Sequence, residues 1–292
     1  MPGTLLIEAF YEPATFTFSY LVMDTASRAA AVIDSVLDFD TKSGRTRTDS
    51  ADHLLARARQ LQADVLWHLE THVHADHLSA APYLMRQLGG QTVIGADIRH
   101  VQQVFGKLFN LGDAFKRDGS QFSRLISDGE TLPLGRFNIR AMHTPGHTPA
   151  CMTYLIDDGE RLHAFVGDTL FMPDYGTARC DFPGGSAQTL YASIHKVLDL
   201  PDNTQLYMCH DYPPAGRGEQ FLSTVKLERE GNVHVGNGVS REAFVAMREK
   251  RDATLSMPAL LLPAVQVNMR AGEFPPAEDN GVSYLKLPIN LL

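Results

Sequence analysis

Four side chains that can bind a metal ion stand close together in the segment THVHADH. They are His72, His74, Asp76 and His77. Imidazole nitrogens and carboxylate oxygens are common protein ligands of zinc and of non-haem iron. A polar loop that is rich in histidine by chance is the alternative, and partner residues further along the chain argue against it. The segment therefore predicts a metal centre.

Three more metal-capable residues occur singly, each at a turn or directly after a strand-like run. TPGHTPA presents His147 on a turn shaped by proline and glycine, GDTLF presents Asp168, and MCHDY presents His210. A rigid sheet can aim side chains at such junctions, and loops can bring them to a common point. His143 is excluded, because the TPG after it cannot continue a helix and place both histidines on one face. The other isolated histidines are expected to be surface or hydrogen-bonded residues.

This set of residues leaves two kinds of metal centre open. All seven residues together can hold two zinc ions and generate a hydroxide for hydrolysis. Two histidines and one carboxylate on one face can instead hold Fe(II) and leave positions for dioxygen and a substrate. The ligand motif alone does not decide between them.

Short apolar runs predict the elements that position these residues. The chain up to Asp34 reads as strands, residues 35–52 as a loop, and a helix is expected from Asp52. The apolar run Val65 to Leu69 predicts a buried strand that ends at THVHADH, where α/β folds commonly place their chemistry. Later elements follow the same rules: a helix closed by Gly89 and Gly90, a helix from about Asp97, a second strand-rich stretch, a helix opened by Ser186, and charged helices before a Pro-rich, apolar tail without a clear period.

Composition limits the classes of partner. The chain has 292 residues, 44% of them hydrophobic, and a formal net charge of -8. A nucleic acid or an anionic membrane would require a basic face, so neither is expected as the main partner. Three scattered cysteines, no signal-peptide pattern at the N-terminus and no long apolar run predict a cytoplasmic protein without a membrane span.

The order H-x-H-x-D-H, His, Asp, His resembles the metallo-β-lactamase superfamily from about residue 16 to residue 212. That resemblance implies an α/β fold, an αββα sandwich with the metal site at one edge between the sheets. We expect a catalytic domain over residues 1–240 and a helical, apolar C-terminal extension over 241–292 that packs on the same domain.

Within the superfamily, three segments resemble the glutathione-dependent persulfide dioxygenases, the sulfur dioxygenase branch. Arg179, Asp181 and Phe182 form an R-x-D-F segment followed by two glycines, HDY follows the last ligand motif, and LLLPAVQVNMRAG matches the C-terminal segment of bacterial members. The phenylalanine pair that glyoxalase II shows after its arginine is absent. Cys180 departs from the family pattern, and a buried, inert thiol is the favoured interpretation.

The resemblance implies one Fe(II) per chain, held by His72, His147 and Asp168, and oxidation of glutathione persulfide by dioxygen to sulfite and glutathione. The remaining motif residues would be the remains of a second metal position: His74, Asp76, His77 and His210. Residues at substrate-contacting positions are Arg179 and Tyr212, with Arg217 and Lys226 as weaker candidates. The main alternative is a dizinc glyoxalase II-type hydrolase of S-lactoylglutathione. A non-catalytic binding protein is disfavoured because all seven candidate ligands are present. A homodimer is a further expectation, with the apolar C-terminal stretch as its interface.

Overall fold

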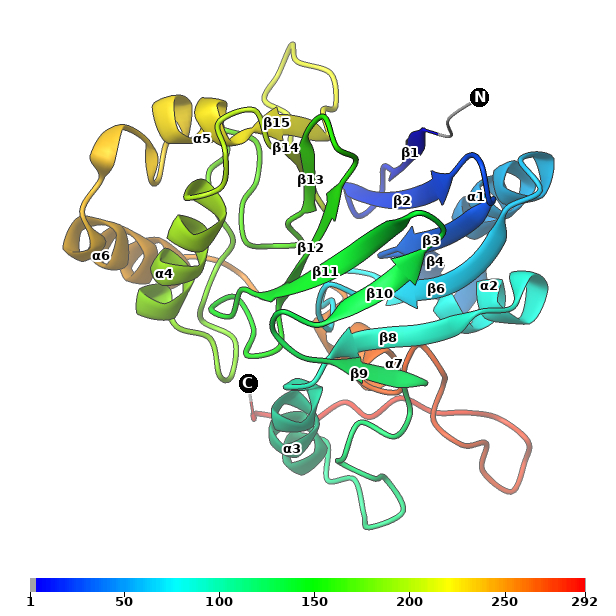
Figure 1. Ribbon diagram of the computed structural model, residues 1–292. Coiled ribbons are helices and arrows are strands. Elements are labelled where there is room, and N and C mark those ends of the chain that lie inside the picture. Colours follow the sequence, from blue (N-terminus) through cyan, green and yellow to red (C-terminus); the bar gives the residue numbers. More distant parts are fainter. Residues whose placement is uncertain (1–3, 292) are drawn as a thin grey trace.

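Two six-stranded sheets pack face to face, with helices on both outer faces, in a computed structural model that describes residues 4–291 (Figure 1). The first sheet has the strand order β1 (Leu5–Glu12), β2 (Thr17–Asp24), β3 (Ala29–Ile33), β6 (Asp64–Leu69), β8 (Gln91–Gly95) and β9 (Arg124–Ile126). The second has the order β10 (Thr131–Leu134), β11 (Phe137–His143), β12 (Met152–Asp157), β13 (Leu162–Phe165), β14 (Gln205–Tyr207) and β15 (Leu222–Thr224). The predicted αββα sandwich is confirmed.

Both sheets mix antiparallel and parallel pairs in a way that serves the site. The strands β3, β6, β8 and β9 run parallel, and so do β13 and β14. Parallel neighbours end at the same edge of a sheet, so loops that follow them meet there. The predicted strand Val65 to Leu69 is β6, and the strand before Asp168 is β13.

The core between the sheets is apolar and rich in aromatic rings. Tyr20 from the first sheet meets Phe165 and Tyr207 from the second at ring-centroid distances of 5.2 and 5.7 Å, both edge to face. Its hydroxyl donates to the carbonyl of Met208 at 2.5 Å. Edge-to-face aromatic pairs stabilise beyond their buried area, and a buried tyrosine hydroxyl needs a partner. Tyr20 therefore holds the end of the second sheet near the ligand-bearing loops.

Helices cover the outer face of each sheet. Those on the first sheet are α1 (Asp49–Gln60), α2 (Ala81–Leu88) and α7 (Leu261–Asn268), and those on the second include α4 (Ala187–Leu198) and α6 (Arg241–Asp252). The remaining helices are α3 (Ile98–Leu108), α5 (Val225–Gly231) and the short η1 (Gly236–Gly238). Ser186 caps α4 by accepting from the amide of Thr189, and Gly89 follows α2, as predicted. No helix within residues 4–291 is long and apolar enough to cross a membrane.

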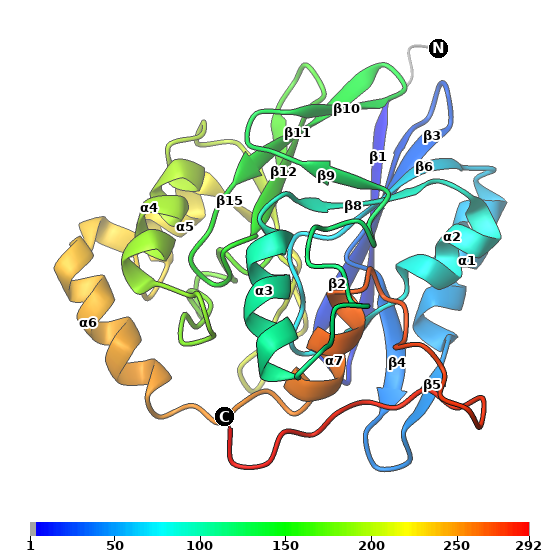
Figure 2. The same cartoon turned by 90° about the horizontal axis from the view of Figure 1, so that it is seen from below.

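One sequence prediction was wrong, and one helix of the expected helical, apolar extension could not be located from the sequence. The expected loop over residues 35–52 contains β4 (Val36–Asp40), β5 (Arg45–Arg47) and the start of α1 at Asp49, because β4 pairs with the distant β7 (Leu78–Ser79) as well as with β5. The apolar tail contains α7, which packs beside α3 and under the first sheet (Figure 2). A helix that is buried on most sides carries no apolar stripe, so periodicity could not reveal it.

Candidate metal centre

The seven predicted residues converge at one edge of the sandwich, and each lies in a loop that follows a strand. The loop after β6 carries His72, His74, Asp76 and His77, the β11–β12 loop carries His147, and the segments after β13 and β14 carry Asp168 and His210. All seven side chains are mostly buried in the interior. The sheet edges therefore bring together residues that lie more than 130 positions apart.

Asp168 lies between two groups of candidate ligands. Its Oδ2 is 3.8 Å from Nε2 of His72 and 3.6 Å from Nε2 of His147, and its Oδ1 is 3.4 Å from Nε2 of His210. The ligand atoms of His72, His147 and Asp168 all lie within 4.8 Å of one another. A second group that meets the same criterion consists of His74, Asp76, His77 and His210.

Hydrogen bonds fix which ring nitrogen of His72 and His147 carries the proton. Nδ1 of His72 lies 3.1 Å from the hydroxyl of Thr71, whose hydrogen is donated to Oδ2 of Asp34, so the hydroxyl accepts from Nδ1. Nδ1 of His147 donates to the backbone carbonyl of Arg179 at 2.8 Å. Each imidazole therefore presents an unprotonated Nε2, the form that binds a metal.

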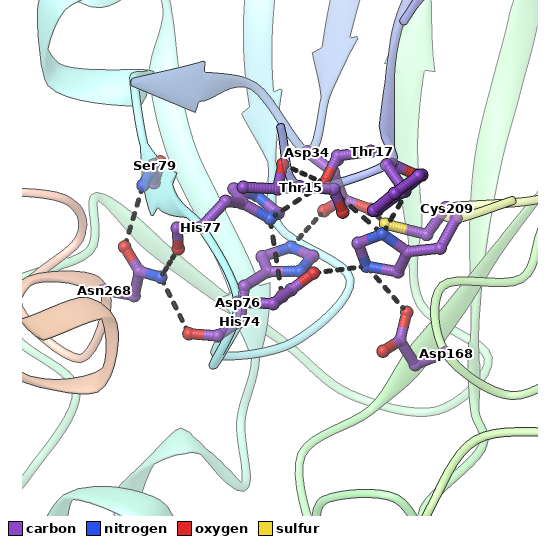
Figure 3. A network of polar contacts seen from close by, with 12 residues as sticks. Thr15, Thr17, Asp34, His74, Asp76, His77, Ser79, Asp168, Cys209 and Asn268 are labelled. Carbon is purple, nitrogen blue, oxygen red and sulfur yellow. Dashed lines mark hydrogen bonds and ion pairs between the residues drawn. The ribbon is translucent and has the colours of Figure 1, made fainter. Parts of the chain in front are cut away.

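The second group of histidines is oriented in the same manner. Nε2 of His74 lies 3.0 Å from Oδ1 of Asp34, which leaves Nδ1 as its free nitrogen (Figure 3). Nδ1 of His210 lies 3.3 Å from the carbonyl of Phe16, and Nδ1 of His77 lies 3.4 Å from the hydroxyl of Thr17. Nε2 of His210 lies 3.0 Å from Asp76 and 3.4 Å from Asp168, and Nε2 of His77 is buried without a hydrogen bond within residues 4–291.

A metal ion would satisfy atoms that this arrangement leaves without partners. Within residues 4–291, six ligand atoms are buried and form no hydrogen bond: His72 Nε2, His74 Nδ1, Asp76 Oδ2, His77 Nε2, Asp168 Oδ1 and His210 Nε2. Two of them, His210 Nε2 and Asp76 Oδ2, lie 3.0 Å apart. A buried polar atom without a partner is costly, and such atoms are rare in folded proteins. Their convergence on two adjacent points is the chemistry expected of a metal-binding site.

Electrostatics favour the neutral form of two of these rings. Burial, reinforced by the neighbouring histidines, lowers the pKa of His72 well below its usual value, and burial also lowers the pKa of His77. His74 differs: burial opposes its charged form, but Asp34 and Glu70 together raise its pKa well above the usual value. His74 is thus the ring most firmly tied to carboxylates outside the ligand groups.

A glycine shapes the turn that presents His147. Gly146 has φ +140°, and a Cβ on it would lie 2.3 Å from the Cα of Leu190 in α4. The carbonyl of Gly146 accepts from the amide of Ser186, and the carbonyl of Pro145 accepts from the hydroxyl of Ser193 at 2.6 Å. The close approach that glycine allows therefore clamps the turn onto α4.

Asn268 supports the first ligand loop from α7. Its Nδ2 donates to the carbonyls of His74 at 2.9 Å and His77 at 2.7 Å, and its Oδ1 accepts from the amide of Ser79 (Figure 3). Asn268 is almost fully buried. The tail thus fixes the backbone of two candidate ligands.

A cavity of about 250 Å³ opens beside the ligands. The candidate ligands Asp76, His147 and Asp168 form part of its lining. Its other walls are aromatic or come from α6 and the chain after it: Phe171, Tyr175, Phe182, Tyr212, Arg248, Arg251, Leu255, Ser256 and Pro258, with Thr177, Ala178 and Arg179 between them. A largely apolar pocket with a few polar groups is typical of a small-molecule site.

Of the four predicted substrate contacts, two line the cavity and two do not. Tyr212 and Arg179 line the cavity, but Arg179 already binds Asp181 through two nitrogens at 2.6 Å and the carbonyl of Ser256 at 2.7 Å. Arg217 and Lys226 do not line it. Arg217 forms ion pairs with two aspartates, and the exposed Lys226 lies 3.9 Å from Glu230. Their predicted contact with substrate has no support in this geometry.

Arg251 is a candidate that the sequence analysis missed. It lines the cavity from the last turn of α6, and no hydrogen bond or ion pair engages its guanidinium within residues 4–291. Its neighbour Arg248 is buried and donates hydrogen bonds to Asp252 and to the carbonyl of Thr177. Both arginines line the cavity, and nothing in the local pattern of α6 shows that the fold engages Arg248 with other groups and leaves Arg251 open to the cavity.

Two exclusions agree with the structure. His143 lies outside both ligand groups, and its Nε2 is 2.9 Å from the carbonyl of Pro149. Cys180 is buried, and burial raises its pKa far above that of a free thiol. Neither residue belongs to the two candidate ligand groups within residues 4–291.

Comparison with known proteins gives a consistent family. The model of the Metallo-beta-lactamase superfamily matches residues 13–210. A Probable metallo-hydrolase of Burkholderia pseudomallei is 63% identical, with 99% of this chain and 100% of that protein covered. Glyoxylase B2 of Dictyostelium discoideum is 48% identical over 100% of this chain and 99% of its own length.

More distant relatives carry a different name. Persulfide dioxygenase ETHE1, mitochondrial, of Bos taurus is 34% identical, with 94% of this chain and 91% of that protein covered. Among solved structures, ETHE1 from Myxococcus xanthus superimposes with a TM-score of 0.71 at 28% identity, covering 92% of this chain and 100% of its own.

Proposed function

Because this chain belongs to the metallo-β-lactamase superfamily and carries its His/Asp metal-binding site, we propose that it is an iron-dependent dioxygenase that converts glutathione persulfide to sulfite and glutathione. One observation carries the proposal. Two histidines and one carboxylate, His72, His147 and Asp168, form a group of their own from which His74 is absent. A 2-His-1-carboxylate face suits Fe(II) and leaves positions for two further reactants.

The surrounding hydrogen bonds favour that triad as a metal site. Thr71 and the carbonyl of Arg179 hold the imidazoles of His72 and His147 with Nε2 unprotonated toward Asp168. His74, in contrast, is engaged by Asp34 and Glu70 on its far nitrogen. The named relative ETHE1 of Bos taurus, a persulfide dioxygenase, supports the same assignment.

The overall reaction balances without a protein nucleophile. Glutathione persulfide, dioxygen and water give glutathione, sulfite and two protons: the outer sulfur loses four electrons to dioxygen, and the S–S bond breaks. When bound, Fe(II) would supply adjacent positions at which sulfur and dioxygen meet. The chain itself holds the ligands, orients the substrate and shields the reacting atoms with the rings of Phe171, Phe182 and Tyr212.

The cavity offers recognition for an anionic, peptide-like thiol derivative. Glutathione carries two carboxylates, and Arg251 presents at the cavity wall a guanidinium that no residue of the described range 4–291 engages. Arg179 keeps two of its five N–H donors beyond those used on Asp181 and Ser256. The ring of Tyr212 stacks on that of His210, with centroids 5.8 Å apart and planes inclined by 21°, and Tyr212 also lines the cavity.

A second candidate is a dizinc thioester hydrolase of glyoxalase II type. The intact group His74, Asp76, His77 and His210 favours it, because each of the four has a buried ligand atom that forms no hydrogen bond within residues 4–291. Oδ1 of Asp168 also lies 3.4 Å from Nε2 of His210. The 48% identity to Glyoxylase B2 also favours it. Both candidates act on glutathione derivatives, so they share the cavity and differ in the metal.

The two are separated by metal analysis and two assays on protein purified without added metal. We expect about one iron per chain, oxygen consumption and sulfite formation with glutathione persulfide, and negligible hydrolysis of S-lactoylglutathione. Two zinc ions per chain with thioester hydrolysis and no oxygen consumption would instead establish the second candidate. We also propose that residues 241–292 belong to the catalytic unit, since Asn268 supports the ligand loop.

A further inference from the structure

A second, smaller cavity lies behind the ligand loops. Its volume is about 20 Å³, and α3 and α7 form one side of it through Val101, Phe105, Leu261 and Val265. The opposite side comes from the loops that carry the ligands, including Val73, Ala75 and Pro149. That volume is enough for one very small molecule.

The chemistry of this cavity excludes a polar occupant. Every side chain in its lining is apolar except that of Thr148. The hydroxyl of Thr148 is already engaged, since it lies 3.1 Å from the sulfur of Cys151 and accepts from the amide of Ala150 at 3.3 Å. A water molecule needs two to four polar partners, whereas small apolar cavities stay dry and take up apolar guests such as xenon.

The cavity adjoins the metal centre. Ala75 and Phe182 line both this cavity and the larger one. The ring of Phe182 meets the ring of His147 edge to face, with centroids 5.3 Å apart. Phe182 therefore contacts both the small cavity and one residue of the candidate iron triad.

We propose that this apolar cavity holds dioxygen and supplies it to the metal centre past the wall that it shares with the larger cavity. The inference rests on the proposed dioxygenase function, and it names a binding site for the second reactant of that reaction. Under the proposed function, glutathione persulfide would occupy the larger cavity beside the ligands. A separate apolar site gives an apolar diatomic molecule a place beside the centre while the substrate is bound.

The test uses xenon as a probe and a variant that fills the cavity from α3. Val101→Phe adds a ring in the cavity, away from every candidate ligand, and Val104→Phe adds the same ring on the same helix outside the cavity. Val265→Leu, from α7, is a second filling variant if Val101→Phe folds poorly, because overpacking can destabilise a core. Metal content and thermal stability are measured for each variant.

We expect xenon in this cavity of the wild-type holoenzyme in a pressurised crystal, and no xenon there in Val101→Phe. We also expect the KM for dioxygen to rise by about threefold or more in Val101→Phe, with the KM for glutathione persulfide and the iron content unchanged. Val104→Phe should behave as wild type in all of these measurements.

Absence of xenon from the wild-type cavity would overturn the proposal. So would displacement of xenon by Val101→Phe with an unaltered KM for dioxygen. Failure of the proposed function gives a different result from both outcomes. The wild-type enzyme would then consume no oxygen with glutathione persulfide, although xenon still occupies the cavity. The dioxygen proposal would fall for that reason.

Discussion

The side-chain amide of Asn268 lies 2.7 Å from the backbone carbonyl oxygen of His77, although the two residues are 191 positions apart. The same amide nitrogen reaches the carbonyl of His74. A helix near the end of the chain thus supports the loop that carries the first ligands, and metal affinity becomes a property of the tail as well as of the loops.

Replacing Asn268 with alanine should weaken metal binding. The change leaves two buried carbonyls and the amide of Ser79 without their partner, so we expect a loss of about 2–4 kcal/mol in stability. Loss of the loop's support should also lower metal affinity by about tenfold or more. Chelator competition and thermal denaturation of the apo-protein measure the two effects separately.

Gln266→Ala is the matched control on the same helix. Gln266 is equally buried, and it bonds to the carbonyl of Leu262 and to the backbone of Lys286 rather than to the ligand loop. It should lose stability without losing metal affinity. Equal metal affinities for wild type and Asn268→Ala would contradict a supporting role for Asn268.

Asp168 and Asp76 should differ in their effect on iron. We expect Asp168→Ala to abolish iron binding and activity, because it removes the carboxylate of the triad. Asp76→Ala should retain about one iron per chain, since Asp76 belongs only to the second group. Metal analysis by mass spectrometry reads out both variants. If each variant lost one of two metal ions, the mononuclear assignment would be wrong.

Arg251→Gln should raise the KM for glutathione persulfide by about tenfold with little change in kcat. The guanidinium would contact a substrate carboxylate remote from the reacting sulfur, and loss of such a contact weakens ground state and transition state alike. Arg241→Gln, on the same helix but outside the cavity, should have no effect. Steady-state kinetics of the two variants measure this effect, with S-methylglutathione as a competitive probe of binding. Identical KM values for wild type and Arg251→Gln would show that Arg251 does not contact the substrate.

Ionisation of Glu228 should lower the free energy of unfolding as the pH rises from 4.5 to 7. Burial raises its pKa from the ordinary 4.5 to about 7, although Asn232 donates to the carboxyl. The native state then holds a proton that the unfolded state has lost, so stability falls with rising pH across this range and is flat above it. Glu228→Gln removes the titration and should be the more stable form at pH 8, by up to about 3 kcal/mol.

Denaturant unfolding at several pH values measures this difference. The advantage of Glu228→Gln should shrink as the pH falls and vanish near pH 4.5. A constant difference between the two proteins at all pH values would show that the carboxyl does not titrate as stated.

Local pattern was enough to predict the strands, the sandwich and the positions where metal-capable residues gather. Each motif residue follows an apolar run, and parallel strands bring such positions to one edge. Whether the seven act as ligands stays a prediction, although they lie together. Asp34 could also have been predicted to belong to the site, because it too follows a strand. Its carboxylate accepts from Thr71 and contacts His74, so it orients these two residues.

Other features depend on distant partners and left no local trace. β4 is a strand because β7 pairs with it, and α7 is buried by the first sheet and α3. Asn268 and Arg251 matter through what the fold places opposite them, a loop in one case and a cavity in the other. Pairings across such distances are decided by tertiary packing, which residue periodicity does not encode.

An isolated backbone bridge joins Thr17 to His210, so the start of the second strand and the last candidate ligand are fastened directly to each other. Ribosomes deliver a chain from its N-terminus at about 5–20 residues per second. The early ligand loop is therefore made long before the residues that complete and brace it. The proposed triad is complete only once Asp168 has been made, so a nascent chain halted before residue 168 should retain no metal through gel filtration.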